Sequence, residues 1–460
     1  MNQTYQEFIA KKSQLGESSG FEPNFLPDFL FDFQKHLVEW AVRKGRAAIF
    51  ADCGLGKTPI QLVWAENVVR KTNRPVLILT PLAVSQQTKR EGDKFGIECH
   101  VSRDGEVKPN ITVTNYERLH YFDSSKFGGV VCDESSCVKA MDGKRRAEVT
   151  EFLRTVGYRL FCTATAAPND YVELGTSSEA LGYMGQRDMI TMFFKQATQK
   201  DHLGWGRTKY LLKGHASGSF WKWVCSWARA CRKPSDLGYS DEAFILPELK
   251  EVVHVVEAKT LAPGFLFSLP ATNMQEERAE RRRTLQERCE QVAEIVNRTD
   301  GPFVIWCHLN DEGTALTKLI QGSEEVSGST SHDKREEVYE AFSSGKLKRL
   351  VIKPKVGAYG LNWQFCNNIA TFASHSFEQY YQAVRRCWRF GQKKPVTVHI
   401  VASEGEEGVF GNLKTKSLAA DAMFSELVAN MNEHLSIKRN NQFTEVATAP
   451  NWLGIKEVPS

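Results

Sequence analysis

The sequence has no long apolar stretch. No run of 18 apolar residues occurs in its 460 residues, and the first residues, MNQTYQEFIAKKSQ, contain no hydrophobic segment. A membrane-spanning helix needs about 20 mostly apolar residues, and a secretion signal needs an apolar core. We therefore expect a protein that neither crosses a membrane nor is secreted, and that works in the cytoplasm.

Paired cysteines and a strong net charge are also lacking. None of the eleven cysteines stands in a CxxC pair, the spacing typical of zinc and redox sites. Cys132 and Cys162 lie in apolar runs, where cysteine behaves as a small hydrophobic residue. We expect reduced thiols, without disulfides or a zinc site. The net charge of +4 is too small to indicate a nucleic-acid partner by itself.

Short apolar runs alternate with helical patterns in two regions of the chain. At this length two or three domains are expected. Runs this apolar predict strands buried on both faces, as in parallel sheets with helices on each side. They lie at residues 47–50, 75–80, 111–114, 129–134 and 158–165, and again at 303–309, 349–354, 368–374 and 396–401. The predicted fold class is α/β, with two doubly wound parallel-sheet lobes.

Five segments follow from this pattern. They are an N-terminal arm (1–25), a first lobe (26–175), an intervening segment (176–250), a second lobe (251–405), and a C-terminal helix and tail (406–460). The intervening segment is rich in tryptophan, glycine and basic residues, and we expect a mostly helical insertion. A charged helix is predicted over residues 273–298, leading into the second lobe.

A glycine-rich turn, ADCGLGKT (51–58), follows the first predicted strand. Gly54 and Gly56 allow backbone N–H groups to approach phosphate oxygens, and the N-terminus of the next helix favours anions. Lys57 can neutralise the β- and γ-phosphates, and Thr58 can place its hydroxyl on Mg²⁺. The turn predicts an ATP phosphate site; the alternative is a glycine-rich turn with a solvated lysine.

Gln34 lies a short distance before this turn. A glutamine amide both donates and accepts hydrogen bonds, which suits the edge of adenine. We expect Gln34 to contact the base of ATP. A solvated glutamine at a helix start is the alternative.

Two adjacent carboxylates, Asp133 and Glu134, end a predicted buried strand. Ligands of doubly wound sheets bind at the carboxyl ends of the strands. Asp133 can hold the shell of a Mg²⁺ ion bound with ATP, and Glu134 can orient or deprotonate the attacking water. A solvated acidic turn is the alternative.

The segment QAVRRCWRFGQ (382–392) carries three arginines of the second lobe. A helix there would put Arg386 and Arg389 on one face, three residues apart. Guanidinium groups reaching across the cleft can stabilise charge on the transferred γ-phosphate, an effect of order 10³–10⁵ in rate in nucleotidases. An ordinary basic helix face is the alternative.

The order of these elements resembles that of superfamily 2 helicases and translocases. The resemblance implies two RecA-like lobes, ATP and Mg²⁺ as cofactors, and a coupling role between the lobes for Thr163 and Thr165 of the TAT element. It also places nucleic-acid contacts in TPLAVSQQTKREGDKF (80–95) and TNYERL (114–119). Within these segments the candidate residues are Thr80, Pro81, Thr114 and Asn115.

The arginine segment and KVGAYGLNWQ (355–364) resemble the Swi/Snf-like branch of that superfamily, and Gly360 of the second motif is placed at the nucleotide. Asn169 also matches the branch, over a resemblance that covers about residues 26–405. Ala166 replaces the branch's proline, and residues 374–377 differ from its Asp and Trp-Asn-Pro run. The chain therefore looks like a small phage- or prophage-type DEAD/DEAH-box helicase-like protein, in a bacterial or phage-infected host.

Residues 185–250 carry eleven Lys or Arg against six Asp or Glu, and four of the ten tryptophans. Basic groups among aromatics suit nucleic acid. Phe220, Trp223 and Trp227 have the helical spacing of a small core, which is the interpretation we favour for them. The candidates for phosphate contact are Lys195, Lys200, Arg207, Lys209 and Lys213.

Three functions remain open from the sequence. The first is an ATP-driven helicase or translocase on double-stranded DNA. The second is the same kind of motor acting on RNA. Gly391 and Gln392 argue against it, because RNA-directed members of the superfamily usually have a G-R-x-x-R pattern there. The third is a non-hydrolysing nucleic-acid scaffold, which would not need Lys57, Glu134 and both arginines. The sequence leaves a protein partner open and predicts no contact with a membrane.

Overall fold

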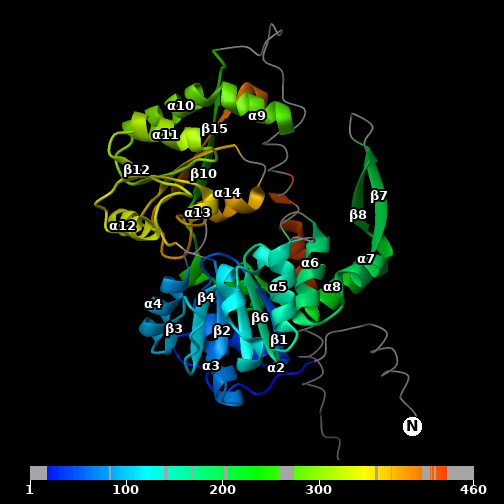
Figure 1. Cartoon of the computed structure of the whole chain (residues 1–460). Helices are drawn as coiled ribbons and strands as arrows, with labels where there is room; N and C mark the ends of the chain where they lie inside the picture. The colour runs from blue at the N-terminus through cyan, green and yellow to red at the C-terminus, as the bar shows by residue number, and fades with distance from the viewer. Residues whose placement is uncertain are drawn as a thin grey trace, which may run out of the picture.

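The structure is a computed structural model. It describes residues 18–81, 84–138, 143–167, 170–200, 206–259, 274–357, 361–373, 376–406, 415, 417–418 and 421–431. Two lobes, each built on a parallel β-sheet, lie one above the other in Figure 1. In the described part of the chain, no helix is both long and apolar enough to span a membrane.

The first lobe contains a seven-stranded sheet in the order β3-β4-β2-β5-β6-β1-β9, with every pair parallel. Its strands are β1 (Arg46–Ala51), β2 (Val76–Thr80), β3 (Cys99–Val101), β4 (Ile111–Asn115), β5 (Gly129–Asp133), β6 (Tyr158–Thr163) and β9 (Ala228–Cys231). Its helices are α2 (Asp32–Lys44), α3 (Lys57–Thr72), α4 (Ser85–Phe95), α5 (Lys144–Leu153), α6 (Leu174–Leu181), α7 (Gln186–Phe193) and α8 (Ser217–Cys225). All five strands predicted for this lobe are confirmed.

The second lobe contains a six-stranded parallel sheet in the order β10-β15-β14-β11-β13-β12. Its strands are β10 (Leu249–Val256), β11 (Phe303–Trp306), β12 (Ser323–Val326), β13 (Arg349–Ile352), β14 (Asn368–Phe372) and β15 (Val396–Ser403). Its helices are α9 (Met274–Arg283), α10 (Leu285–Arg298), α11 (Asn310–Leu319), α12 (His332–Ser343), α13 (Pro354–Gly357) and α14 (Phe377–Val384). The four strands predicted here are confirmed, and the predicted charged helix is present as α9 and α10.

The inner strands of the second sheet are buried on both faces. Along β11, Val304 and Trp306 belong to the hydrophobic cluster on one face, whereas Phe303 and Ile305 belong to the cluster on the other. Because side chains alternate along a strand, a sheet covered by helices on both faces needs a continuous apolar run. The predicted doubly wound arrangement follows from this.

The segment between the lobes differs from the mostly helical insertion predicted for residues 176–250. It contains α7 and α8, but also an antiparallel hairpin of β7 (Phe194–Lys200) and β8 (Gly206–Leu212), which projects beside the second lobe in Figure 1. Strand β9 then pairs with β1 and completes the first sheet. Phe220, Trp223 and Trp227 are buried in the first-lobe core, in agreement with the core interpretation.

The C-terminal helical residues 421–431 return to the first lobe. Met423, Phe424, Leu427 and Met431 are buried in its core, although the preceding strand β15 belongs to the second lobe. The Cys225 thiol on α8 donates to the carbonyl oxygen of Leu427 at 3.7 Å. The end of the described chain therefore ties one lobe to the other.

Candidate nucleotide and nucleic-acid sites

The phosphate loop lies between β1 and α3, as predicted. Gly54 and Gly56 have φ angles of +91° and +73°, which glycine adopts without strain. The Lys57 ammonium donates to the carbonyl oxygens of Ala51 at 3.0 Å and Asp52 at 3.4 Å. A Cβ added at Gly54 would lie 2.9 Å from the backbone nitrogen of Phe390 in the second lobe, so only glycine leaves room at this closely packed point.

Gln34 holds the phosphate loop. Its amide nitrogen donates to the Leu55 carbonyl oxygen at 2.9 Å, and its amide oxygen accepts from the Phe31 N–H at 3.0 Å. The side chain is buried and lines the same cavity as the loop glycines. Both ends of the amide therefore bond to protein backbone, and its predicted contact with adenine stays a prediction.

Asp133 and Glu134 lie at the carboxyl end of β5, where the sequence places them. The Gln61 amide donates to Asp133 Oδ1 at 2.6 Å, and the Thr163 hydroxyl donates to Glu134 Oε2 at 3.2 Å. Burial, and then the neighbouring Glu134 charge, raise the pKa of Asp133 to about 6. Glu134 has a φ of +48°, a conformation that is uncommon for a residue with a side chain and is found at functional sites.

Arg386 and Arg389 line the cavity that contains the phosphate loop and both carboxylates. The prediction that a helix carries them is wrong, since α14 ends at Val384 and the two arginines follow in turns. Arg386 donates to the Leu361 carbonyl oxygen at 3.1 Å, and Arg389 donates to the side chain of Asn362. These bonds hold both guanidinium groups at the cavity wall. Burial lowers the pKa of Arg389 to about 10.

This nucleotide cavity has a volume of about 630 Å³ and lies between the lobes. Thr58 and Asp133, the predicted magnesium partners, line it together with Lys57. A hydroxyl and a carboxylate beside a lysine suit Mg²⁺-bound phosphates, so the residues present fit Mg²⁺ and ATP. Gly360, also predicted at the nucleotide, lies outside the described residues.

The TAT element reaches the second lobe. The Thr165 N–H donates to the Thr163 hydroxyl at 3.1 Å, and the Thr165 hydroxyl donates to Glu378 on α14 at 3.4 Å. Because Thr163 also bonds to Glu134, a short chain of hydrogen bonds joins the hydrolysis residues to the other lobe. The coupling role of both threonines stays a prediction, which this chain supports.

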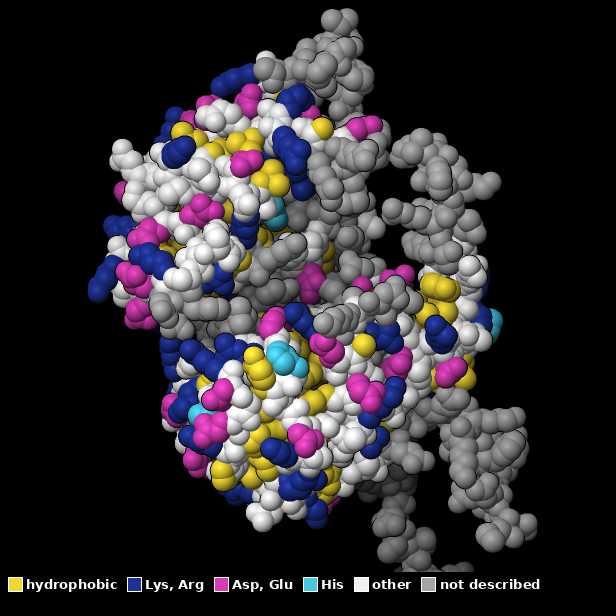
Figure 2. Space-filling view, viewed as in Figure 1, with side chains coloured by type: hydrophobic (Ala, Val, Ile, Leu, Met, Phe, Trp, Pro, Cys, Tyr) yellow, Lys and Arg dark blue, Asp and Glu magenta, His cyan; other side chains and the backbone are white. Residues whose placement is uncertain are grey.

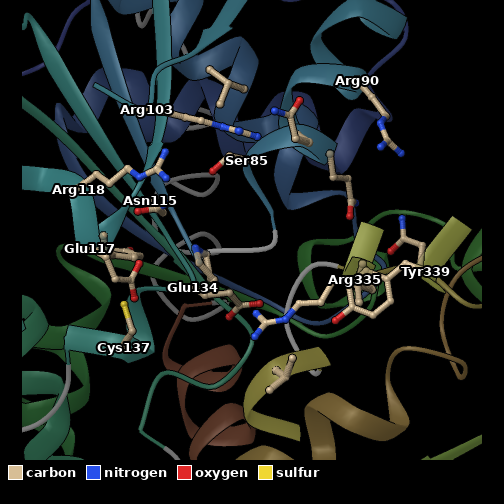
Figure 3. Close-up of a pocket in the computed structure, with 18 of the residues that line it drawn as sticks. Ser85, Arg90, Arg103, Asn115, Glu117, Arg118, Glu134, Cys137, Arg335 and Tyr339 are labelled. Carbon is tan, nitrogen blue, oxygen red and sulfur yellow. The ribbon is translucent and has the colours of Figure 1, made fainter. Parts of the chain in front are cut away.

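A second cavity, of about 750 Å³, opens between the lobes beside the first (Figure 3). Arg335 and Tyr339 of α12 face first-lobe residues across it in that view. Pro81 and Asn115, two of the predicted nucleic-acid contacts, line this cavity. Five arginines also line it: Arg90, Arg103, Arg118, Arg145 and Arg335.

The two threonines predicted with them do not line the cavity. Thr80 and Thr114 are buried, and their hydroxyls bond to Ser85 at 2.9 Å and to the Ser102 carbonyl oxygen at 2.9 Å. These buried hydrogen bonds hold the ends of β2 and β4 in place. Because these side chains are enclosed, only backbone groups at the two positions remain to contact nucleic acid, and their predicted role stays a prediction.

The basic candidates of the intervening segment lie on or beside the hairpin. Lys195 is exposed on β7. Lys200, Arg207 and Lys209 belong to β7 and β8, but their side chains lie outside the described part of the structure. Lys213 differs from the prediction, since its ammonium donates to the last carbonyl oxygens near the end of α7, those of Thr191 and Met192, at 2.9 and 3.0 Å. Lys213 therefore stabilises a helix end.

Sequence reasoning missed a cluster of polar contacts between α14 and the phosphate loop. Arg385 forms an ion pair with Asp52 and donates to the Cys53 carbonyl oxygen at 2.8 Å, while the Tyr381 hydroxyl also donates to Asp52. One signal was available, because an acidic residue inside an anion-binding loop needs a cation nearby. Its partner is 333 positions away in the chain, and no local pattern identifies it.

Aromatic rings at the rim of the nucleotide cavity were missed as well. Phe31, Phe244 and Phe390 contact one another, with ring centroids 4.9 Å apart for Phe31–Phe244 and for Phe244–Phe390. Phe31 belongs to the first lobe and Phe390 to the second, and their side chains are 44% and 40% exposed. Exposed rings beside Gln34 provide a surface on which a flat base can stack.

Parts of this chain are similar in sequence to known proteins. Residues 287–391 match the helicase conserved C-terminal domain. The chain is 35% identical over 106 residues to the bifunctional helicase and thymine dioxygenase JBP2 of Leishmania tarentolae, covering 23% of this chain but only a tenth of that protein. It is 22% identical over 448 residues to putative protein p41 of Acyrthosiphon pisum secondary endosymbiont phage 1, covering 81% of this chain and 92% of the phage protein.

One solved structure that aligns with the chain is the SWI2/SNF2 ATPase core of Sulfolobus solfataricus in complex with double-stranded DNA. The alignment covers 89% of this chain and 96% of the Sulfolobus chain. The sequence identity is 17% and the TM-score 0.40, which is too low to establish a shared fold. The similarity to helicases therefore rests on the sequence matches, and the two parallel-sheet lobes agree with it. Together they support the resemblance drawn from the sequence: the chain is similar to helicases over residues 287–391 and to a phage protein over 81% of its length.

Proposed function

We propose that this protein is an ATP-driven motor that hydrolyses one ATP between its lobes and works on double-stranded DNA. The observation that carries the proposal is the nucleotide cavity. Lys57, Asp133 and Glu134 of the first lobe and Arg386 and Arg389 of the second line this one space. A cavity completed by both lobes makes hydrolysis depend on how the lobes are arranged.

Each residue has a chemical role in this proposal. Lys57 binds the β- and γ-phosphates, and Thr58 and Asp133 hold a Mg²⁺ ion, which neutralises phosphate charge when bound. Glu134 orients the attacking water and takes its proton. Arg386 and Arg389 stabilise charge on the transferred phosphoryl group from the side of the second lobe.

The second cavity supports a nucleic-acid track. Arg90, Arg103 and Arg118 make no hydrogen bond or ion pair through their side chains with another described residue, so their charges are available to phosphates. Glu134 lines both cavities. A strand bound in the second cavity would therefore lie beside the residue that activates water, which gives a direct route from DNA binding to hydrolysis. The motor would act in the cytoplasm of a bacterial or phage-infected host.

The choice of double-stranded DNA rests on the Swi/Snf-like resemblance and on the Gly391-Gln392 ending. ATP turnover should be measured for the full chain with duplex DNA, single-stranded DNA and RNA at equal phosphate concentration. We expect duplex DNA to stimulate turnover most, and Lys57→Ala to abolish it with every nucleic acid. Stimulation by RNA alone would establish the RNA-directed alternative, and no turnover under any condition would favour the scaffold.

A further inference from the structure

One face of α14 makes the polar contacts that join the second lobe to the phosphate loop and the TAT element. Glu378, Tyr381, Gln382 and Arg385 follow one another at the i, i+3, i+4 and i+7 spacing of a single helix face, with Arg385 at the C-terminal cap. Glu378 accepts from Thr165, and Gln382 accepts from the Cys53 thiol at 3.6 Å. Tyr381 and Arg385 both bond to Asp52.

Asp52 is held from both lobes. On the side of the first lobe, its carboxylate accepts from the Cys53 N–H at 2.6 Å, and its own N–H donates to the Cys231 carbonyl oxygen at 2.9 Å. On the side of the second lobe, it accepts from the Tyr381 hydroxyl and the Arg385 guanidinium. The side chains of Arg385 and Asp52 are 5% and 13% exposed, so solvent screens this ion pair little.

The same contacts lead to the cavity arginines. Gln382, which accepts from Cys53, also accepts from Arg386 at 2.8 Å. Arg386 follows Arg385 directly in the chain, so fixing Arg385 on the loop fixes the backbone that carries Arg386. These contacts run from protein to protein and need no phosphate.

We propose that Asp52, Tyr381 and Arg385 form a latch that closes the second lobe on the phosphate loop and positions Arg386 and Arg389 at the nucleotide cavity. The three latch residues are positioning residues, because they act on the nucleotide through the arginines and the loop. Arg385 also neutralises the Asp52 carboxylate, a negative charge within the loop that binds anionic phosphates. The latch thus has two effects, lobe closure and charge compensation.

Two variants separate these effects. Arg385→Ala removes the closure contact and leaves the Asp52 charge unpaired beside the phosphates, so both opening and weaker ATP binding are expected. Asp52→Asn removes the ion pair and the negative charge, keeps one acceptor oxygen and leaves Arg385 without its counterion, so opening is expected with less loss of ATP affinity. Truncating one partner of a buried charge pair commonly shifts an equilibrium by about 30-fold or more. Adding Asp52→Asn to Arg385→Ala should restore part of the ATP affinity and none of the closure.

Small-angle X-ray scattering of the nucleotide-free full chain measures closure without any hydrolysis. The radius of gyration should rise in Arg385→Ala, Asp52→Asn and Tyr381→Phe. Tyr380→Phe is the matched control, because the Tyr380 hydroxyl donates to Glu251 within the second lobe. Wild-type scattering from Tyr381→Phe and Asp52→Asn, or equal opening in Tyr380→Phe, would overturn the latch. If Arg385→Ala does not fold, the scattering of Tyr381→Phe and Asp52→Asn tests the latch without it.

The assignment of Arg386 and Arg389 rests on the proposed function, but the scattering result does not. A chain that opens in the latch variants yet never hydrolyses ATP would overturn the proposed function and keep the latch. If the wild type hydrolyses ATP and every latch variant scatters like the wild type, the latch is overturned and the proposed function is kept. In an active chain, Tyr381→Phe should lower kcat more than it raises KM for ATP, because it weakens closure without exposing a charge.

Discussion

The docking of the C-terminal helix on the first lobe predicts a specific loss of stability in Leu427→Ala. The Leu427 side chain is 1% exposed in the first-lobe core, beside Met423 and Phe424. Full burial of a leucine contributes about 1.5–3 kcal/mol, and leucine-to-alanine changes in protein cores cost about 2.7–5 kcal/mol once the cavity is included. Because a helix at the surface can shift into the space, we expect a loss of about 2–3 kcal/mol.

Urea unfolding followed by tryptophan fluorescence measures this change. Trp221, Trp223 and Trp227 are buried in the first-lobe core, whereas Trp306 and Trp363 lie in the second lobe. The lobes are expected to unfold in separate steps, so only the first-lobe transition should move to lower urea. The second-lobe transition, which should not move, then serves as an internal reference in the same curve.

Leu418→Ala is the matched control, since Leu418 is 61% exposed and a surface change of this kind costs about 0.5 kcal/mol or less. The packing of this helix on the first lobe is contradicted if Leu427→Ala and Leu418→Ala unfold at the same urea concentration as the wild type. It is also refuted if Leu427→Ala lowers the second-lobe transition and leaves the first unchanged. Either result would mean that the helix does not pack where the structure places it.

Three further predictions concern the motor. Arg386→Ala and Arg389→Ala should each lower ATP turnover by a factor of roughly 10² or more with little change in nucleotide affinity, as measured by steady-state kinetics and fluorescent-nucleotide titration; normal hydrolysis in both would exclude a role for them at the phosphates. The protein should displace the third strand of a DNA triplex without unwinding a forked duplex, and unwinding of the fork would contradict translocation along an intact duplex. Changing Lys195, Arg207 and Lys209 together to alanine should flatten the slope of log affinity against log salt by about one to three units, since each phosphate contact contributes roughly 0.9; an unchanged slope in the folded variant would make the hairpin a spacer.

Within the two large sheets, the predicted strands all lie inside and the missed ones lie at the edges; the hairpin strands β7 and β8 were missed as well. The nine predicted runs correspond to the interior strands of both sheets. The missed strands β3, β9, β10 and β12 are the edge strands. An edge strand has a neighbour on one side only and is often partly exposed, as Val253 and Val255 of β10 are at 50% and 57%. Such a strand needs no continuous apolar run, so the pattern that reveals interior strands does not detect it.

The nucleotide motifs were predictable because each is local in sequence. A phosphate loop and a strand-end carboxylate pair need only short runs of residues, and the parallel sheet brings their strand ends to one edge. The pairing of Asp52 with Arg385 is not local, since it joins residues from different lobes. The enclosure of Thr80 and Thr114 and the capping role of Lys213 likewise depend on packing. Residue type and spacing do not show whether a polar side chain ends at the surface or against a backbone carbonyl.

Glu134→Gln separates ATP binding from ATP hydrolysis. The substitution keeps the size of the side chain and removes its ability to accept a proton from water, while Lys57 and the loop glycines remain to bind ATP. ATP binding and duplex-stimulated turnover should be measured on the same preparation of the variant and the wild-type chain. We expect ATP binding close to that of the wild type and turnover lower by a factor of at least about 10², the contribution of a general base. Full turnover in Glu134→Gln would contradict the assignment of Glu134 as the residue that activates water, and with it the proposed mechanism of hydrolysis between the lobes.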